Sequence, residues 1–235
     1  MISLIVPIYN EKSISSFLKH TIESAKSDSF EIILVEGYLK KPILPKAIIF
    51  EGSAVSIKVI HTKVRNRALQ QNQGACSAIG DVLLFLHSDT LLPLNWDYSL
   101  RLSLSRKKCI GGCFWKKFDS LNPLLFLNAF FTNLRALFFN VYLGDNAIFV
   151  RNSIFSNIGG FDNVPILEDV IFTKKMRAYV RQNNSQLVVV RRRVITSARR
   201  FYKYGIVSTF IRMQRVWFHY LRGDELSYVA KKYKD

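Results

Sequence analysis

The sequence predicts an α/β fold: one domain with a mixed, mostly parallel sheet, helices on both of its faces, and an amphipathic helix near the carboxyl end. Short apolar runs typical of buried strands alternate along the chain with stretches of helical period. The 235 residues are enough for one sizeable core and do not require two. We see no repeat, low-complexity block or clear linker that divides the chain.

The first half of the chain alternates regularly between the two kinds of pattern. The expected strands are 2–8, 31–36, 47–50, 57–61 and 81–87, and the expected helices are 13–25 and 65–78. The run at 81–87 follows Gly80 and is almost wholly apolar, which is typical of an interior strand of a parallel sheet.

The second half gives strands at 110–118, 147–151 and 186–196 and helices at 95–105, 168–179 and 205–221. The helix at 168–179 has two acids in its first turn and basic residues later, which complements the helix dipole. The segment 205–221 is rich in aromatic residues and arginine, as in an amphipathic helix. We therefore expect a main domain over 1–204 and a basic amphipathic helix and tail over 205–235.

Composition restricts the class of protein. With 49% hydrophobic residues the chain is predicted to fold, which excludes general disorder. The net charge is +17, and residues 191–235 hold twelve basic against three acidic residues, so this segment alone carries +9. Such a segment attracts nucleic acid, anionic lipid headgroups or phosphorylated substrates.

Cysteine usage and hydropathy indicate a cytoplasmic protein. The three cysteines lack metal-site spacing and form no even set, so free thiols in a reducing compartment are expected. No signal peptide is expected, because the apolar start is short. Polar residues, Pro123 and Arg135 interrupt the most hydrophobic stretch, 121–143, so it is not expected to span a bilayer, although it suits the surface of one.

The run 83–90 is the most informative segment, because an apolar strand ends there on the carboxylate of Asp89. In open α/β sheets, ligands bind beyond the carboxyl ends of the strands, so Asp89 is expected to face that crevice. No cation lies beside Asp89 in the sequence, and its carboxylate suits Mg²⁺ or Mn²⁺. The structural alternative is a residue that caps the following turn.

Four segments stand in an order that points to one family. They are the strand and turn 4–11; the run 83–90; Gly144-Asp145-Asn146 followed by Gly159-Gly160-Phe161-Asp162 and Glu168-Asp169; and the element 196–201. Together they resemble the inverting nucleotide-sugar glycosyltransferases of family 2, which have the GT-A fold. Each motif alone is weak, but four in this order are specific.

A narrower resemblance, over about residues 2–205, is to the bacterial selenodomain-associated or arsenosugar-biosynthesis glycosyltransferases. Its residues are Arg65-Asn66-Arg67-Ala68, Gln71-Asn72-Gln73-Gly74-Ala75, His87-Ser88-Asp89-Thr90 and Ser197-Ala198-Arg199-Arg200. The chain departs from the wider family where Glu36-Gly37-Tyr38 replaces an Asp-Gly-X-Ser-X-Asp motif and where Phe201 replaces a tryptophan. Its Asp-X-Asp motif is reduced to Asp89.

The resemblance implies transfer of a sugar from a UDP- or GDP-sugar to an acceptor hydroxyl, with inversion and with Mg²⁺ or Mn²⁺. Asp89 and His87 are the metal-binding candidates, because an ion neutralises charge on the departing diphosphate. Asp169 is the predicted base, with Glu168 beside it, because the acceptor hydroxyl must lose its proton. The alternatives are a structural histidine and two helix-capping acids.

Further residues are assigned to the two substrates. The candidates for the donor are Pro7, Tyr9, Asn10, Glu11, Glu36, Arg65, Arg67, Gln71, Ser88, Arg199 and Arg200; those for the acceptor are Gly144, Asp145 and Asn146. Arginines suit a diphosphate because their contacts are bidentate and always charged. The structural alternatives are a solvated basic face for Arg199 and Arg200, a surface helix for Arg65, a cap for Asn10 and Glu11, and a turn for Asp145.

The expected partners are the nucleotide-sugar, a small-molecule or lipid-linked acceptor, an anionic membrane at its inner face, and a second copy of the chain. Nucleic acid is not expected, although a basic nucleic-acid-binding protein is a competing hypothesis from the +17 charge. A nucleotidyltransferase needs a glycine-rich loop that the turn 6–11 lacks. An inactive relative of the glycosyltransferases is the remaining alternative.

Overall fold

The computed structural model describes residues 1–11, 14–38, 41–45, 47–50 and 52–234. Its strands form one eight-stranded sheet in the order β3-β2-β1-β4-β7-β6-β8-β5. The strands are β1 (Ile2–Ile8), β2 (Phe30–Gly37), β3 (Ser56–Thr62), β4 (Val82–Phe85), β5 (Thr90–Leu91), β6 (Cys109–Phe118), β7 (Ile148–Arg151) and β8 (Gln186–Thr196). Strands β3, β2, β1 and β4 run parallel to one another, as do β6 and β8, whereas β7 and β5 pair antiparallel with their neighbours.

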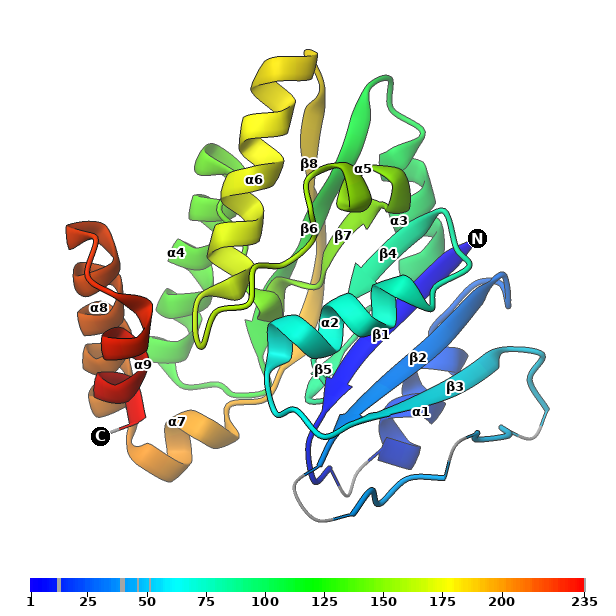
Figure 1. The fold of residues 1–235 in the computed structure, drawn as a ribbon, viewed down its shortest axis with the longest axis horizontal. Helices are drawn as coiled ribbons and strands as arrows, with labels where there is room; N and C mark the ends of the chain where they lie inside the picture. The colour runs from blue at the N-terminus through cyan, green and yellow to red at the C-terminus, as the bar shows by residue number, and fades with distance from the viewer. Residues whose placement is uncertain (12–13, 39–40, 46, 51, 235) are drawn as a thin grey trace.

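Helices cover both faces of the sheet (Figure 1). They are α1 (Ile14–Glu23), α2 (Arg67–Cys76), α3 (Trp96–Leu104), α4 (Pro123–Phe139), α5 (Asn152–Asn157), α6 (Glu168–Asn183), α7 (Arg199–Tyr204), α8 (Ile206–Arg222) and α9 (Leu226–Lys234), with a 3₁₀ turn at Gly144–Asn146. The predicted fold class, an α/β domain with a mixed, mostly parallel sheet, is confirmed.

Alternation along the strands sends neighbouring side chains into two separate cores. In β1, Leu4 and Val6 pack with α1 and α3, whereas Ile5 packs on the other face with residues of α2, α5 and α6. All three of these side chains are fully buried. Because strands buried on both faces need no polar positions, the central strands appear in the sequence as continuous apolar runs.

The structure corrects several expected elements. Residues 47–50 are not a strand: Ala47 makes one isolated bridge to Lys58, while Ile48 and Phe50 pack on the core without ladder pairing. The strand expected at 81–87 is only β4, because the chain turns after Leu86. Strand β5 and helices α5, α7 and α9 were not predicted, since their short patterns gain order only from tertiary packing. The long helix α4 was not predicted either, because apolar residues stand at most of its positions and leave no clear helical period.

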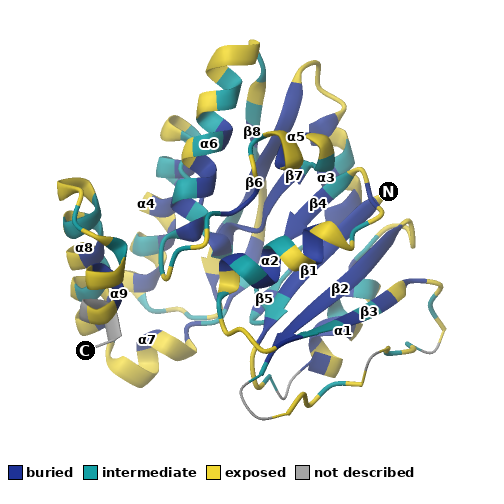
Figure 2. Ribbon diagram, in the orientation of Figure 1, coloured by how far each residue is buried: buried dark blue, intermediate teal, exposed yellow. Residues whose placement is uncertain are grey.

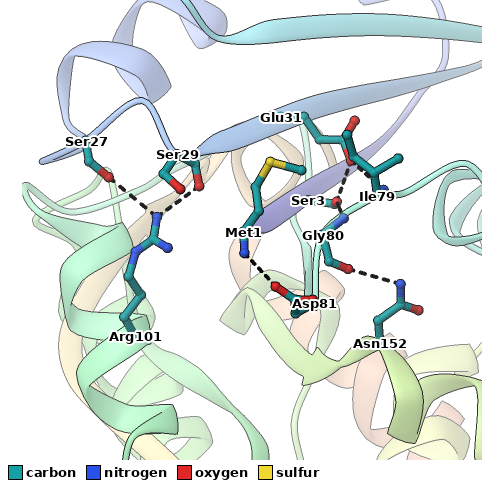
Figure 3. Close-up of polar contacts among 10 residues, drawn as sticks. All are labelled: Met1, Ser3, Ser27, Ser29, Glu31, Ile79, Gly80, Asp81, Arg101 and Asn152. Carbon is teal, nitrogen blue, oxygen red and sulfur yellow. Dashed lines mark hydrogen bonds and ion pairs between the residues drawn. The ribbon is translucent and has the colours of Figure 1, made fainter.

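The amino ends of β1, β2 and β4 are fastened by polar contacts (Figure 3). The amino group of Met1 lies 2.7 Å from Asp81, and Ser3 donates a 2.6 Å hydrogen bond to Glu31, which also accepts from the backbone of Ile79. The polar residues at this edge of the sheet therefore have a structural role. The carboxyl ends of the same strands lie at the opposite edge, where residues 87–90 emerge.

The last part of the chain packs on α4 rather than on the central sheet (Figure 1). Leu125 and Ala129 of α4 form a third apolar cluster with Phe118 and Phe201, against which Met213 of α8 packs. Many large apolar side chains of α4 and α8 remain exposed. Figure 2 shows that exposed residues occur along α8. Among the helices described, none is both long and apolar enough to cross a membrane.

Candidate active site

Asp89 is held at the carboxyl edge of the sheet by the turn that follows β4. The backbone N–H of Thr90 donates to the carbonyl of His87 (3.1 Å), and the N–H of Ser197 donates to the carbonyl of Asp89 (3.1 Å). Pairing of β5 with β8 places Thr90 opposite Thr196. Asp89 therefore lies beside the start of α7, with 28% of its side chain exposed.

Arg199 joins two carboxylates that are far apart in the sequence. Its Nη2 lies 3.3 Å from Oδ2 of Asp89 and 3.4 Å from Oε2 of Glu11. Ser88 donates a 3.2 Å hydrogen bond to the same oxygen of Glu11. Burial raises the pKa of Asp89, and the charge of Arg199 opposes that rise. Four predicted site residues thus meet at one point.

Glu168 and Asp169 open helix α6, but Asp169 does more than cap it. Its Oδ1 accepts from the N–H of Val170 (2.7 Å) within the first turn, and its Oδ2 accepts from the N–H of Gly144 (2.6 Å) in another segment. Burial, followed by the neighbouring charge of Glu168, raises the pKa of Asp169 to about 7. Glu168 is itself buried and lies 3.3 Å from Nη1 of Arg67.

His87 and Asp169 share the space beside Gly144. A Cβ atom on Gly144 would lie 2.6 Å from Nε2 of His87 and 3.5 Å from Oδ2 of Asp169. Nε2 of His87 is buried, with no hydrogen-bond partner among the described residues. Burial, with a smaller contribution from Arg67, lowers the pKa of His87 to about 3, so the imidazole is neutral. The segment that carries Asp89 therefore reaches the predicted base.

The charge of Arg67 acts on all three of these groups. It favours the ionised forms of Asp89 and Asp169 and disfavours protonation of His87. Arg67 begins α2, which is capped by the side chain of Asn66. The turn after β4, the start of α6 and the start of α2 thus form one electrostatic cluster.

Within the turn Gly144–Asn146, the three predicted acceptor residues have different environments. Asp145 lies 2.6 Å from the buried amine of Lys116. Burial alone would raise the pKa of Asp145, but the Lys116 charge brings it below its ordinary value. Asn146 is fully buried and donates to the carbonyl of Phe114, which is a structural role. Gly144 supplies the N–H that binds Asp169.

The residues predicted to bind the nucleotide are divided between two groups. At the end of β1, the guanidinium of Arg65 lies 3.7 Å from the ring centre of the partly exposed Tyr9, and Asn10 has a left-handed backbone (φ 49°). Pro7 pairs with Val35 inside the sheet. These residues surround the carboxyl end of β1, as the sequence suggests for a nucleotide site.

Glu36, Gln71 and Arg200 differ from that group. Glu36 is buried and accepts from the N–H groups of Ile43 (2.9 Å) and Leu44 (3.1 Å), so it holds the loop after β2. Gln71 is buried in α2, and its Oε1 has no hydrogen-bond partner in the described part of the chain. Arg200 is exposed at the start of α7, one residue after Arg199.

The donor atoms at Asp89 fit a divalent ion that is completed by substrate. The described residues contain no group of three or more histidine, cysteine or acidic side chains able to hold a metal by themselves. Asp89, Glu11 and Ser88 nevertheless supply hard oxygen atoms close together. Mg²⁺ is commonly bound by one or two carboxylates plus substrate phosphates and water, and this set suits such a site.

Two cations beside the acids, the buried Lys116 and the partly buried Arg135, were missed by the sequence analysis. Lys116 pairs with Asp145, and the charges of Asp145 and Asp169 act on Arg135, whose pKa is lowered by burial. Arg135 is the one charged residue of the apolar stretch 121–143, and a lone cation in such a segment is a signal of a partner inside the protein. Lys116 has no such signal, because Lys117 follows it directly.

Comparison with known proteins identifies the family of this chain. A model of glycosyl transferase family 2 matches residues 3–141. An uncharacterized glycosyltransferase of Haemophilus influenzae is 31% identical over 90 residues, which is 38% of this chain and 29% of that protein.

Solved structures with low sequence identity share the fold. A mannosyltransferase from Pyrobaculum calidifontis, in complex with GDP-Man and Mn²⁺, superposes with a TM-score of 0.57 at 15% identity, over 83% of this chain and 56% of that one. S. aureus TarS 1-349 in complex with UDP-GlcNAc gives 0.58 at 17% identity, over 83% and 58%. The chain therefore spans less than two thirds of the length of these relatives.

Proposed function

This chain belongs to glycosyl transferase family 2, and we propose that it transfers a sugar from a nucleotide-diphosphate donor to an acceptor hydroxyl, with inversion and with a divalent ion. That it is a glycosyltransferase follows from the family; the donor, the ion and the stereochemistry are the proposal. The observation that supports the proposal is the arrangement of the two acids: the charge of Arg67 acts on both Asp89 and Asp169, and His87 of the Asp89 segment lies beside Asp169 at Gly144. We propose that Asp89 acts on the leaving group and Asp169 on the acceptor.

Asp89 and Arg199 are proposed to serve the leaving diphosphate. When bound, Mn²⁺ or Mg²⁺ supplies Lewis-acid neutralisation of the charge that grows on the departing oxygens. Asp89 would hold that ion with Glu11 nearby, and His87 is kept as a further candidate ligand because its imidazole is neutral. Arg199 lies between Asp89 and Glu11, and its guanidinium is a group that binds phosphate oxygens well.

Asp169 is proposed to remove the proton of the attacking hydroxyl. A base works best when its pKa is close to the pH at which it operates, and that of Asp169 is about 7. The N–H groups of Gly144 and Val170 orient its carboxylate before the substrate arrives. A single positioned base, with the leaving group on the far side of the sugar, is what an inverting displacement requires.

The donor is proposed to be a UDP- or GDP-sugar, supported by the ligands of the two related structures. Tyr9 and Arg65, with the turn after β1, are the proposed seat of the nucleotide. The proposed acceptor is a small molecule or lipid-linked, at Gly144 and Asp145. We also propose that the chain belongs to the selenodomain-associated or arsenosugar-biosynthesis subfamily and that its main domain ends at residue 204. An anionic membrane at the cytoplasmic face is the proposed further partner.

The test is to measure the rate at which the Asp89→Ala variant cleaves the donor, with Asp81→Ala as the control. Asp81 precedes β4 and Asp89 follows it, so the two variants remove a carboxylate from opposite ends of one strand. With a panel of UDP- and GDP-sugars and Mn²⁺, we expect Asp89→Ala to lose on the order of 100-fold in rate. Asp81→Ala should keep its rate. Full activity in a folded Asp89→Ala protein contradicts the proposal.

A further inference from the structure

An apolar pocket of ≈ 460 Å³ lies between helices α4 and α8. Leu125 and Phe131 of α4 form one wall, and Phe210, Met213 and Trp217 of α8 form the other. This volume lies in the range of small-molecule sites, roughly 300–1,000 Å³. The two helices stand beside each other at the edge of the molecule (Figure 1).

Two residues of the pocket lining stand next to the proposed active site along the chain. Leu143 lines it and is followed directly by Gly144, whose N–H binds Asp169. Phe201 lines it from α7, two residues after the Arg199 that contacts Asp89. The lining therefore comes within one residue of Gly144, which binds the proposed base, and within two residues of Arg199.

The polar side chains of the lining come mainly from α4, with Gln214 contributed by α8. Arg135 lines the pocket, and the carbon of its guanidinium lies 4.7 Å from the ring centre of Trp217. The charges of Asp145 and Asp169 favour its protonated form. Its Nε and the Oδ1 of Asn128 are buried without a hydrogen-bond partner in the portion of the chain described. A ligand that is apolar along most of its length and polar at one end satisfies both features.

We propose that this pocket seats the aliphatic chain of the acceptor, with the polar head of the acceptor directed to Asp169. The proposal rests on the proposed function, because it names the acceptor class of that site as an amphiphile with a hydrocarbon chain. Removal of such a chain from water is favourable by about 0.8 kcal/mol per methylene, which is a fourfold change in affinity.

The charge of helix α8 and the exposed apolar side chains of the lining favour a chain drawn from an anionic membrane. Helix α8 carries Arg212, Arg215 and Arg222 and no acidic residue. Val207 and Leu124 line the pocket and are 60% and 53% exposed, so its mouth is apolar. A helix that carries basic side chains and also exposes apolar ones matches the interface between headgroups and acyl chains.

Alkyl glucosides test the seat without knowledge of the natural acceptor. In calorimetric titrations, octyl β-D-glucoside below its micelle-forming concentration should bind at one site, and affinity should fall about fourfold for each methylene removed from its chain. Methyl β-D-glucoside should not bind. The heat capacity change should be negative, as for burial of apolar surface. Equal binding of octyl and methyl glucosides overturns the proposal.

Two matched variants locate the seat. Val207→Trp fills the pocket from α8, whereas Ile211→Trp enlarges an exposed side chain one turn further on that is outside the lining. We expect octyl glucoside to bind at least tenfold more weakly to Val207→Trp and unchanged to Ile211→Trp, with both proteins folded by thermal unfolding. If Val207→Trp does not fold, Gln214→Trp fills the same pocket. If Val207→Trp and Ile211→Trp weaken the binding of octyl glucoside equally, the pocket is not the site of the alkyl chain.

Donor cleavage separates the acceptor role from the function itself. Octyl glucoside should slow cleavage of the nucleotide-sugar by water, or itself receive the sugar, in wild type and in Ile211→Trp but not in Val207→Trp. Chain-dependent binding with no effect on cleavage overturns the acceptor role. Absence of all donor cleavage, with chain-dependent binding intact, contradicts the proposed function and leaves the chain seat standing.

Discussion

At the scale of single residues, the environment of Asp169 decides its chemistry. Burial and the charge of Glu168 push its pKa up to about 7, while the Gly144 N–H and Arg67 oppose that rise. Glu168 in turn lies 3.3 Å from Arg67. The acid and the arginine beside Asp169 therefore act on it with opposite sign.

The dependence of activity on pH follows from these signs. Asp169 accepts a proton only when ionised, so kcat/KM should rise with pH through about 7 and level off above it. Asp169→Asn should lose about 10²–10⁴-fold in kcat/KM at all pH values. In Glu168→Gln, the rise should move to lower pH, because the neighbouring negative charge is gone.

The control for this pH profile is Asp162→Asn. Asp162 pairs with Lys175 of α6 and is not among the groups that shift the pKa of Asp169. Its profile should coincide with that of the wild type. A rise at the same pH in Glu168→Gln and wild type would show that the titrating group is not Asp169.

Single residues could be predicted where a chemically suitable side chain stands at the end of an expected strand or helix. Asp89, Asp169 and Arg199 stand at ends of strands and helices in a recognisable order, and the structure brings them into one cluster. The partners Lys116 and Arg135 were not predicted, because their contacts join residues distant in the chain. Glu36 looked like a ligand position, yet its oxygens hold the loop at 41–45.

At the scale of elements, close packing of α2 on the sheet positions the arginine end of the site. A Cβ atom on Gly74 would lie 2.5 Å from Cγ2 of Ile5 and 3.1 Å from Cγ2 of Val35. Both are methyl groups of fully buried, β-branched side chains that have no room to move. Glycine therefore lets α2 approach β1 and β2 closely enough to direct Arg67 toward Asp169.

Gly74→Ala tests this packing. Alanine favours a helix by about 1 kcal/mol over glycine, but overpacking of a core typically costs about 1–3 kcal/mol. We expect a net decrease in the free energy of unfolding, measured with urea. Cys76→Ala, on an exposed position of the same helix, should stay within about 0.5 kcal/mol of wild type. A Gly74→Ala protein more stable than wild type would contradict the close approach.

Elements with a strong period were the predictable ones. Strand β8 was expected at 186–196 and is Gln186–Thr196, and β1 was expected at 2–8 and is Ile2–Ile8. Short elements were not, because a two-residue strand such as β5 exists only through its pairing with β8. Helix α4 is long but was missed, because its sequence is apolar at most positions. The run 47–50 has a strand-like composition but makes one isolated bridge to Lys58 of β3 instead of a ladder.

At the scale of the whole molecule, charge and exposed apolar surface gather toward the carboxyl end. The segment 191–235 carries +9 of the +17 net charge. Phe126 and Phe130 of α4 are 67% and 47% exposed, and Phe218 and Leu221 of α8 are 57% and 77% exposed. This combination is typical of a surface that binds anionic lipid. The charge suits both lipid and nucleic acid, whereas the exposed apolar side chains favour lipid.

Vesicle flotation distinguishes the two partners. We expect the protein to bind vesicles of anionic phospholipid, to bind neutral vesicles more weakly, and to lose binding as salt rises, because exposed charges are screened. The double variant Phe126→Ser and Phe130→Ser should bind less, whereas Ile79→Ser, 69% exposed elsewhere, should not change. Salt-sensitive binding to DNA or RNA without vesicle binding would favour the nucleic-acid hypothesis instead.

The central claim is that Asp89 holds a divalent ion against the donor diphosphate while Asp169 acts on the acceptor. Calorimetric titration of UDP and GDP, with and without Mn²⁺, separates these roles in wild type, Asp89→Asn and Asp169→Asn. We predict that Mn²⁺ tightens binding of the preferred nucleotide in wild type and in Asp169→Asn but not in Asp89→Asn. The same Mn²⁺ effect in all three proteins, or no nucleotide binding in any, would contradict it.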